Sequence, residues 1–167
     1  EKTNGNPFWA LEFLKSMTDS KLIEVVDGCC KLTVSIDKVT LPSSVESLIT
    51  SRMDRMAPQQ QLLMKMGSVI GTNFKTTELG FLGEQLRLDM PTDTELIQVL
   101  DKLCHEEMLQ REPGQRATPE YKFRHKYLQD VSYSLMPEEL KEKLHRAAAE
   151  FYEGSFGLHS TTLKGIK

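Results

Sequence analysis

Proline divides this chain into short segments and limits the helices that it can form. The seven prolines are Pro7, Pro42, Pro58, Pro91, Pro113, Pro119 and Pro137. Proline is favoured in the first turn of a helix and breaks a helix from within, so we expect no helix to run through one of them. Most of the segments place apolar residues at helical spacing, which predicts a mainly α-helical fold. The expected helices cover residues 7–20, 45–56, 58–70, 74–86, 93–108, 125–135 and 137–153.

Two β-rich stretches interrupt these helices. Asp27-Gly28 separates residues 22–26 from a run that alternates to Ile36, and this dipeptide between such runs is a strong hairpin signal. Later, residues 108–111 and 121–124 flank a polar loop that contains proline and glycine. Helices followed by such a hairpin have the outline of a winged helix-turn-helix domain. The expected order is therefore a helix and a hairpin, a winged helix-turn-helix domain, and two C-terminal helices.

Composition argues against several kinds of partner and compartment. A net charge of -3 gives no general affinity for nucleic acid or anionic membrane. No apolar run approaches the roughly 20 residues that span a bilayer. Cys29, Cys30 and Cys104 suit neither a zinc site nor a disulfide framework, which favours a reducing compartment and leads us to expect a cytoplasmic protein. Because the first residue is Glu1 rather than methionine, we expect a piece of a longer protein.

No catalytic or metal-binding motif stands out in the sequence. The phosphate-binding pattern G-x-x-x-x-G-K-[ST] does not occur, nor does His-Glu-x-x-His. A chain without a phosphate-binding loop is not expected to hydrolyse nucleotides by itself.

A winged helix suggests DNA binding, but the charge of the helix that would enter the groove opposes it. Residues 93–108 hold five acidic side chains and one lysine, which gives -5 + 1 = -4. Phosphates repel a helix of this charge. The hairpin region is basic, through Arg111, Arg116, Lys122, Arg124 and Lys126. Contact with nucleic acid through the hairpin alone therefore stays an alternative, although we do not expect it.

His125 is the histidine with the most informative position. It stands where the strand of residues 121–124 gives way to a helix, and there a ring nitrogen and the backbone donors of the first helical turn can face one anion. A lone histidine is more often structural than functional, so both interpretations stay open on position alone.

Several stretches, taken in order, carry a resemblance to a known family. Residues 5–8 (Gly-Asn-Pro-Phe) precede an amphipathic helix, and residues 41–49 (Leu-Pro-Ser-Ser-Val-Glu-Ser-Leu-Ile) are followed by Arg-Met-Asp-Arg-Met at 52–56. Residues 123–131 read Phe-Arg-His-Lys-Tyr-Leu-Gln-Asp-Val, and residues 137–150 form a further block. Together they resemble the regulatory region of STAND-class P-loop ATPases, in particular the subgroup attached to class III adenylate cyclases, which make cyclic AMP.

The resemblance implies a domain organisation and a ligand. Residues 1–40 would end an AAA-like helical lid, residues 41–136 would form the winged helix, residues 137–153 would lead toward a helical repeat, and residues 154–167 would be a loose tail. Gly5, Asn6 and Pro7 would lie against the base or sugar of ADP or ATP, and His125 would contact the β-phosphate of ADP. The ATPase core, the cyclase domains and the magnesium ligands would lie outside this sequence.

Departures from the family pattern leave open whether this copy still changes conformation with the bound nucleotide. Trp9 stands where the family often has phenylalanine, and Gly28-Cys29-Cys30 stands where it often has Gly-x-Trp. These exchanges preserve packing but do not establish that this copy still responds to nucleotide. A scaffold that has lost its nucleotide contact is therefore a further alternative.

Overall fold

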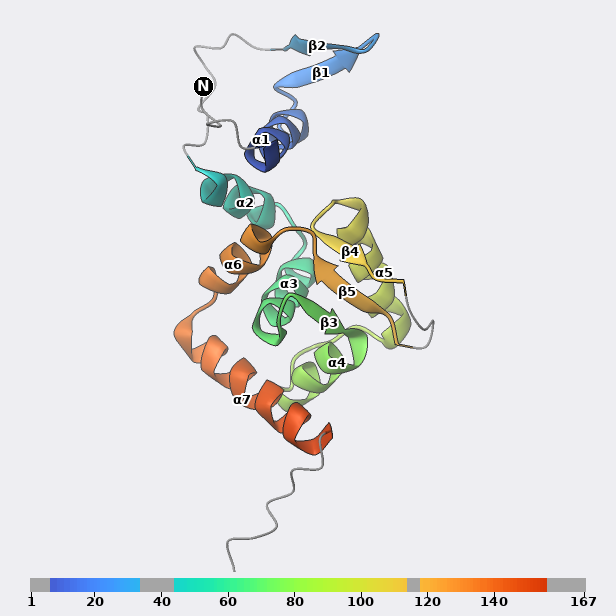
Figure 1. The fold of residues 1–167 in the computed structure, drawn as a ribbon, viewed down its shortest axis with the longest axis vertical. Helices are drawn as coiled ribbons and strands as arrows, with labels where there is room; N and C mark the ends of the chain where they lie inside the picture. The colour runs from blue at the N-terminus through green and yellow to red at the C-terminus, as the bar shows by residue number, and fades with distance from the viewer. Residues whose placement is uncertain (1–6, 34–43, 114–117, 156–167) are drawn as a thin grey trace, which may run out of the picture. The chain divides into compact units, whose positions relative to one another are not determined.

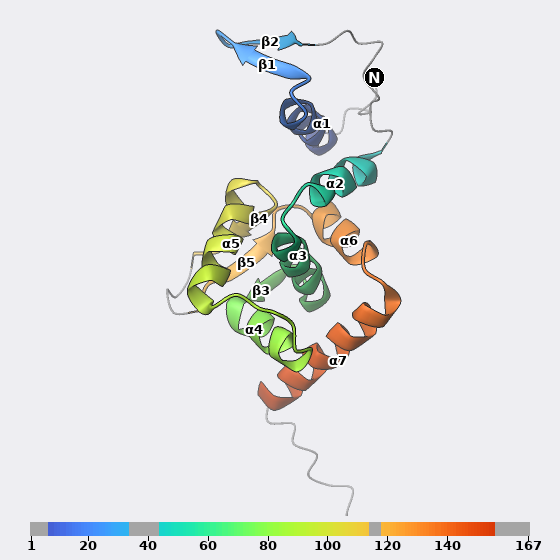
Figure 2. The ribbon, with the colours of Figure 1, turned by 180° about the vertical axis from the view of Figure 1, so that it is seen from behind.

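The computed structural model describes residues 7–33, 44–113 and 118–155, and these residues form seven helices and two small antiparallel sheets (Figures 1 and 2). The expectation of a mainly α fold is confirmed. Contacts divide the chain into two compact units, residues 1–56 and residues 57–167. The predicted limit between residues 40 and 41 lies outside the described residues, and the domain limits stay predictions.

The first unit contains helix α1 (Pro7–Asp19), a hairpin of β1 (Ile23–Val26) and β2 (Cys29–Leu32), and helix α2 (Val45–Asp54). The hairpin was expected at this place, and its register pairs Val26 with Cys29. Asp27 and Gly28 both have positive φ, 54° and 76°, which is the backbone of a two-residue type I′ turn. The alternating positions 34 and 36 lie outside the described residues.

Helix α2 begins where its capping sequence predicts. The Ser44 hydroxyl accepts a hydrogen bond from the Ser47 backbone N–H at 3.1 Å, and the Ser47 hydroxyl accepts one from the Ser44 N–H at 3.2 Å. This reciprocal pair is a capping box, which satisfies donors that a helix start leaves without partners. The helix buries Leu48, Ile49 and Met53.

A buried ion pair joins α1 to α2. The Arg52 guanidinium donates to the Glu12 carboxylate, and their side chains are only 7% and 2% exposed. Lys15 pairs with the other Glu12 oxygen at 3.2 Å. Removing one partner of such a pair leaves an uncompensated buried charge, so the pair holds the two helices in a defined arrangement.

The second unit runs α3 (Pro58–Ile70), β3 (Asn73–Lys75), α4 (Thr76–Gln85), α5 (Asp93–His105), β4 (Leu109–Arg111), β5 (Glu120–Phe123), α6 (Lys126–Ser134) and α7 (Glu138–Ser155). The strand order is β3-β5-β4, with both pairings antiparallel. Helix α3 packs against both α6 and α7, and α7 also lies along α4, as both views show (Figures 1 and 2).

Several of the expected helix limits are wrong. Residues 74–86 were expected to be helical, but Phe74 lies in β3, and α4 begins at Thr76. Phe74 is 1% exposed and pairs with Tyr121 across the sheet, so long-range burial outweighs the local helical pattern. The helix expected at residues 93–108 ends at His105, because Glu107 turns the chain with a φ of 57° and delivers Met108 to the core. At the C-terminus, α7 continues through Ser155, so residues 154 and 155 are helical rather than loose.

The core of the second unit is centred on three aromatic rings from the sheet. Phe74 lies 5.7 Å from Phe123 and 6.4 Å from Tyr121, measured between ring centroids. Gly67 of α3 approaches the same cluster so closely that an added Cβ would stand 2.7 Å from the Phe74 Cε1 atom. The absence of a side chain at Gly67 therefore lets α3 lie against the sheet.

Hydrogen bonds of Glu78 connect α7 to the beginning of α4. One of its carboxylate oxygens accepts the Lys75 N–H at 2.6 Å, and the other accepts the Tyr152 hydroxyl at 2.8 Å. Burial, followed by this bond to Glu78, raises the pKa of the Tyr152 hydroxyl to about 12. The last turns of α7 are thus held by a protonated tyrosine.

Candidate functional site

The joint between β5 and α6 is attached on two sides. At the end of the strand, the Phe123 N–H donates to the Thr72 carbonyl at 3.0 Å, and the next N–H, of Arg124, donates to the Met108 carbonyl at 3.2 Å. Thr72 precedes β3 and Met108 precedes β4. The position of the following residue, His125, is therefore set by both neighbouring strands of the sheet.

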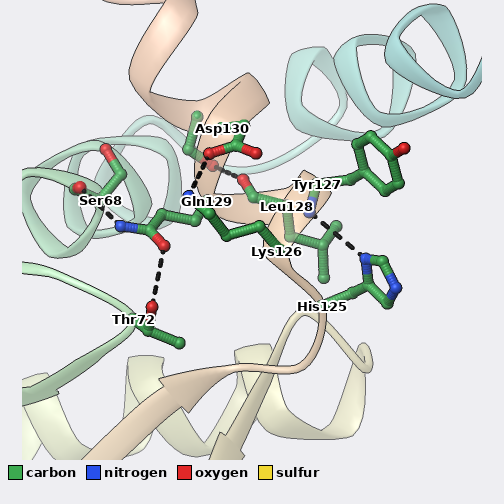
Figure 3. Close-up of polar contacts among 9 residues, drawn as sticks. Ser68, Thr72, His125, Lys126, Tyr127, Leu128, Gln129 and Asp130 are labelled. Carbon is green, nitrogen blue, oxygen red and sulfur yellow. Dashed lines mark hydrogen bonds and ion pairs between the residues drawn. The ribbon is translucent and has the colours of Figure 1, made fainter.

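His125 is the N-cap of α6. Its backbone is extended (φ -146°, ψ 146°), and its ring Nδ1 accepts a hydrogen bond from the Tyr127 N–H at 3.3 Å (Figure 3). The ring also stacks on the Tyr127 ring, with centroids 5.3 Å apart and planes 4° apart. Because Nδ1 acts as an acceptor, this hydrogen bond selects the neutral tautomer that carries its proton on Nε2.

The helix start offers fewer backbone donors than the sequence suggested. In sequence, the position of His125 allows the ring and the first-turn N–H groups to face the same anion. The Tyr127 N–H donates to the His125 ring, and the Leu128 N–H donates to the His125 carbonyl at 3.0 Å. A contact between His125 and an anion would consequently rely on Nε2–H more than on the helix terminus.

Gln129 is a positioning residue that the sequence analysis did not single out. Its amide donates to the Ser68 carbonyl at 3.2 Å and accepts from the Thr72 hydroxyl at 3.2 Å (Figure 3). It points toward Ser68 and Thr72, away from the His125 ring (Figure 3). Gln129 thus connects α6 to the end of α3 and to the segment before β3. No local pattern marks this role, since its partners lie 61 and 57 residues away in the sequence.

The charged side chains around the joint are paired with one another. Lys126 contacts Asp130 at 2.6 Å, one helical turn away, and Arg124 lies 3.8 Å from Glu107. All four side chains are at least 39% exposed, so each pair contributes little to stability. The two cations and two anions balance, and the joint carries no large net charge of its own.

The other predicted site residues belong to the first unit. Pro7 is the first residue of α1 and is exposed, as expected for proline at a helix start. Gly5 and Asn6 lie outside the described residues. Pro7 and His125 belong to different units, so their contact with one shared nucleotide stays a prediction.

Across the described residues, no group of three or more His, Cys, Asp and Glu side chains could hold a metal ion. Within the same ranges, every helix is too short or too polar to cross a membrane.

Comparisons with protein-family models, with curated proteins and with solved structures find no match to this chain.

Proposed function

We propose that this chain is a non-catalytic regulatory segment of a STAND-class nucleotide-switch ATPase, within a cytoplasmic protein like soluble adenylyl cyclase. His125 contacts the β-phosphate of ADP, and Gly5, Asn6 and Pro7 lie against its base or sugar. Exchange of ADP for ATP would then alter this contact and shift the segment relative to the ATPase core. The resemblance of the sequence motifs supplies the identity of the ligand and of the parent protein.

The single observation that carries this proposal is the geometry of His125. Its Nδ1 accepts a hydrogen bond from the Tyr127 N–H, and stacking on the Tyr127 ring orients the imidazole plane. The tautomer that results has Nε2–H as its donor, which is the group that a phosphate oxygen requires. A hydrogen bond with a charged partner contributes roughly 1.5–3 kcal/mol, equivalent to a tenfold to hundredfold change in affinity.

The topology of the second unit supports the winged-helix part of the proposal. Its order is α3, β3, α4, α5, β4 and β5, with β3 beside β5 and with β4 and β5 forming a hairpin. Three helices with a strand after the first and a hairpin after the third correspond to a winged helix-turn-helix outline. In the proposal, the β5–α6 joint that follows the hairpin presents His125 to the nucleotide.

The nucleotide would need further groups from the ATPase core. His125 supplies one donor, whereas a nucleotide diphosphate and its Mg²⁺ require a phosphate cradle and oxygen ligands. The sequence has no phosphate-binding loop. The core would therefore bind the phosphates and the ion, and this chain would report which nucleotide is present.

The test is the ADP affinity of the parent protein with two substitutions at one position. His125→Ala removes both the cap and the Nε2 donor, whereas His125→Asn keeps a good N-cap and removes the imidazole with its Nε2 donor and its stacking on Tyr127. We expect both variants to weaken ADP binding by about tenfold or more, measured by titration calorimetry. Unchanged ADP affinity in His125→Asn would refute the sensor role and leave a scaffold.

DNA binding is the competing function, and the structure adds an observation against it. Acidic neighbours lower the net positive charge of the β4–β5 hairpin: Asp101 lies 3.2 Å from Arg111, and Glu112 pairs with Lys122. A gel-shift titration with random duplex DNA tests this alternative. Tight binding with a steep salt dependence would favour DNA over the nucleotide switch.

A further inference from the structure

An open groove of about 430 Å³ lies between the end of α4 and one face of α7. Its apolar lining consists of Leu86, Leu88, Leu140 and Ala147, which are buried or half-buried. The turn that follows α4 forms one wall, and α7 forms the other. All of the lining residues belong to the second unit, so the groove is a feature of that unit alone.

Three exposed cations stand among the residues that line this groove. They are Arg87 on the turn and Lys143 and Arg146 on α7. Glu150 is the single acidic residue of the lining. An apolar lining with an excess of positive charge is complementary to a ligand that is apolar on one side and acidic beside it.

Arg87 holds its place at a conformational cost. Its φ of 51° lies in the left-handed region, and the turn is closed by hydrogen bonds from the Arg87 N–H to the Glu84 carbonyl and from the Leu88 N–H to the Gly83 carbonyl. This is a helix C-terminus at which glycine is the usual residue. An arginine there is strained, because the left-handed backbone brings its Cβ too close to the following carbonyl oxygen. The strained backbone therefore belongs to a residue, Arg87, whose charged side chain lines the groove.

The cations on α7 form exposed ion pairs with acidic residues one turn away in the same helix. Lys143 contacts Glu139 at 2.6 Å and Arg146 contacts Glu142 at 3.1 Å, and all four side chains are more than half exposed. Such exposed pairs one turn apart contribute little to stability. Carboxylates of an incoming ligand can therefore replace them at small cost.

We propose that this groove binds an acidic amphipathic α-helix of a partner protein. Apolar side chains at helical spacing would enter between Leu86, Leu88 and Leu140, and flanking carboxylates would pair with Arg87 and Arg146. The chain's own C-terminal segment does not fit this description, because residues 156–167 contain two lysines and no acidic residue.

The proposal is tested with a fluorescently labelled synthetic peptide and the full 167-residue chain. The peptide carries leucine at every third or fourth position and glutamate at most others, and binding is followed by anisotropy. Arg87→Gly relieves the strained backbone, so weaker binding in this variant cannot be attributed to misfolding. We expect a loss of about twofold to fivefold for Arg87→Gly, and about tenfold or more for Arg87→Glu combined with Arg146→Glu. Lys102→Glu on α5 is the matched control and should bind as the wild type does.

Reversing the charges of both the peptide and the groove distinguishes specific binding at the groove from nonspecific binding. A second peptide with lysine in place of glutamate should bind the Arg87→Glu, Arg146→Glu double variant better than it binds the wild type. Three results would overturn the proposal: no binding of the acidic peptide, equal binding of a peptide with scrambled leucines, or equal binding by the double variant. Duplex DNA that binds the wild type but not the double variant would instead identify a nucleic-acid surface.

Discussion

Replacement of Gly67 by alanine should destabilise the second unit, although alanine is the better helix former. An added Cβ would stand 2.7 Å from the Phe74 Cε1 atom, 2.9 Å from Cζ and 3.1 Å from Cδ1. Carbon atoms pack at about 3.5–4.0 Å, so the ring or the helix must move. Phe74 cannot move freely, because it is 1% exposed and packs against Tyr121 and Phe123.

The magnitude follows from two opposing effects. Overpacking of a filled core costs about 1–3 kcal/mol, and a rigid aromatic neighbour places this site in the upper part of that range. Alanine recovers about 1 kcal/mol of helix propensity relative to glycine. We therefore expect Gly67→Ala to lower the free energy of unfolding by about 1–2 kcal/mol.

Gly80 provides a matched control within the same unit. It lies inside α4, and an added Cβ there would meet no atom within 4 Å. Gly80→Ala should therefore raise the free energy of unfolding by about 0.5–1 kcal/mol. All four tyrosines belong to the second unit, so urea unfolding followed by near-ultraviolet circular dichroism of tyrosine reports on this unit.

The two alanine variants should change the free energy of unfolding in opposite directions. Opposite signs for the two glycines would support the close packing of α3 on Phe74. A gain in stability for Gly67→Ala equal to that for Gly80→Ala would refute it, because only helix propensity would then be acting. Phe74→Leu combined with Gly67→Ala should recover part of the loss by making room for the added methyl group.

Two further predictions concern the buried polar contacts. Arg52→Met leaves the Glu12 carboxylate buried with Lys15 as its cation, and should lower the free energy of unfolding of the first unit by about 3 kcal/mol. The fluorescence of the single tryptophan, Trp9, reports on the unfolding of this unit. A loss of stability smaller than that of an exposed ion pair would contradict the burial of the Arg52–Glu12 pair. The raised pKa of Tyr152 means that its contact with Glu78 stabilises the fold below about pH 10, the pKa of the unfolded tyrosine, and loses this effect as the pH rises toward about 12. The wild type should therefore lose more stability than Tyr152→Phe between these pH values in thermal unfolding, and parallel curves would refute the linkage.

Local signals explain the elements that the sequence predicted well. Asp27 and Gly28 adopt the left-handed backbone that a two-residue turn requires, whatever the rest of the chain does. Ser44 caps α2 through its neighbour Ser47, and Pro58 occupies the first turn of α3. Each of these features depends on residues within four positions of one another. Such features can be recognised without knowledge of the fold.

Features that depend on distant partners were missed. Phe74 has a local pattern that suits a helix, and only its pairing with Tyr121 makes it a strand residue. Arg52 and Glu12 are 40 residues apart, and nothing in either neighbourhood indicates that the two charges meet in a buried position. Tertiary contacts decide in such cases, because burial contributes more than local preference.

Some features of the candidate site were likewise predictable from local sequence, and others were not. The position of His125 at a strand-to-helix joint was predictable from the sequence around it, and the structure confirms that α6 starts there. The hydrogen bond from the Tyr127 N–H to the ring was not predictable, because a histidine is not among the usual capping residues. The bridge made by Gln129 required knowledge of where α3 ends.

The central position of β5 also has a consequence for how the second unit folds. Its partner β4 lies close by in sequence, across a short loop, whereas β3 and Thr72 come from far upstream; Thr72 and Gln129 are 57 residues apart. Closing a long loop costs more entropy than closing a short one, so the β4–β5 hairpin can form early and β3 joins it later. We therefore expect the hairpin side of the His125 joint to form first and the attachment through β3 to form second.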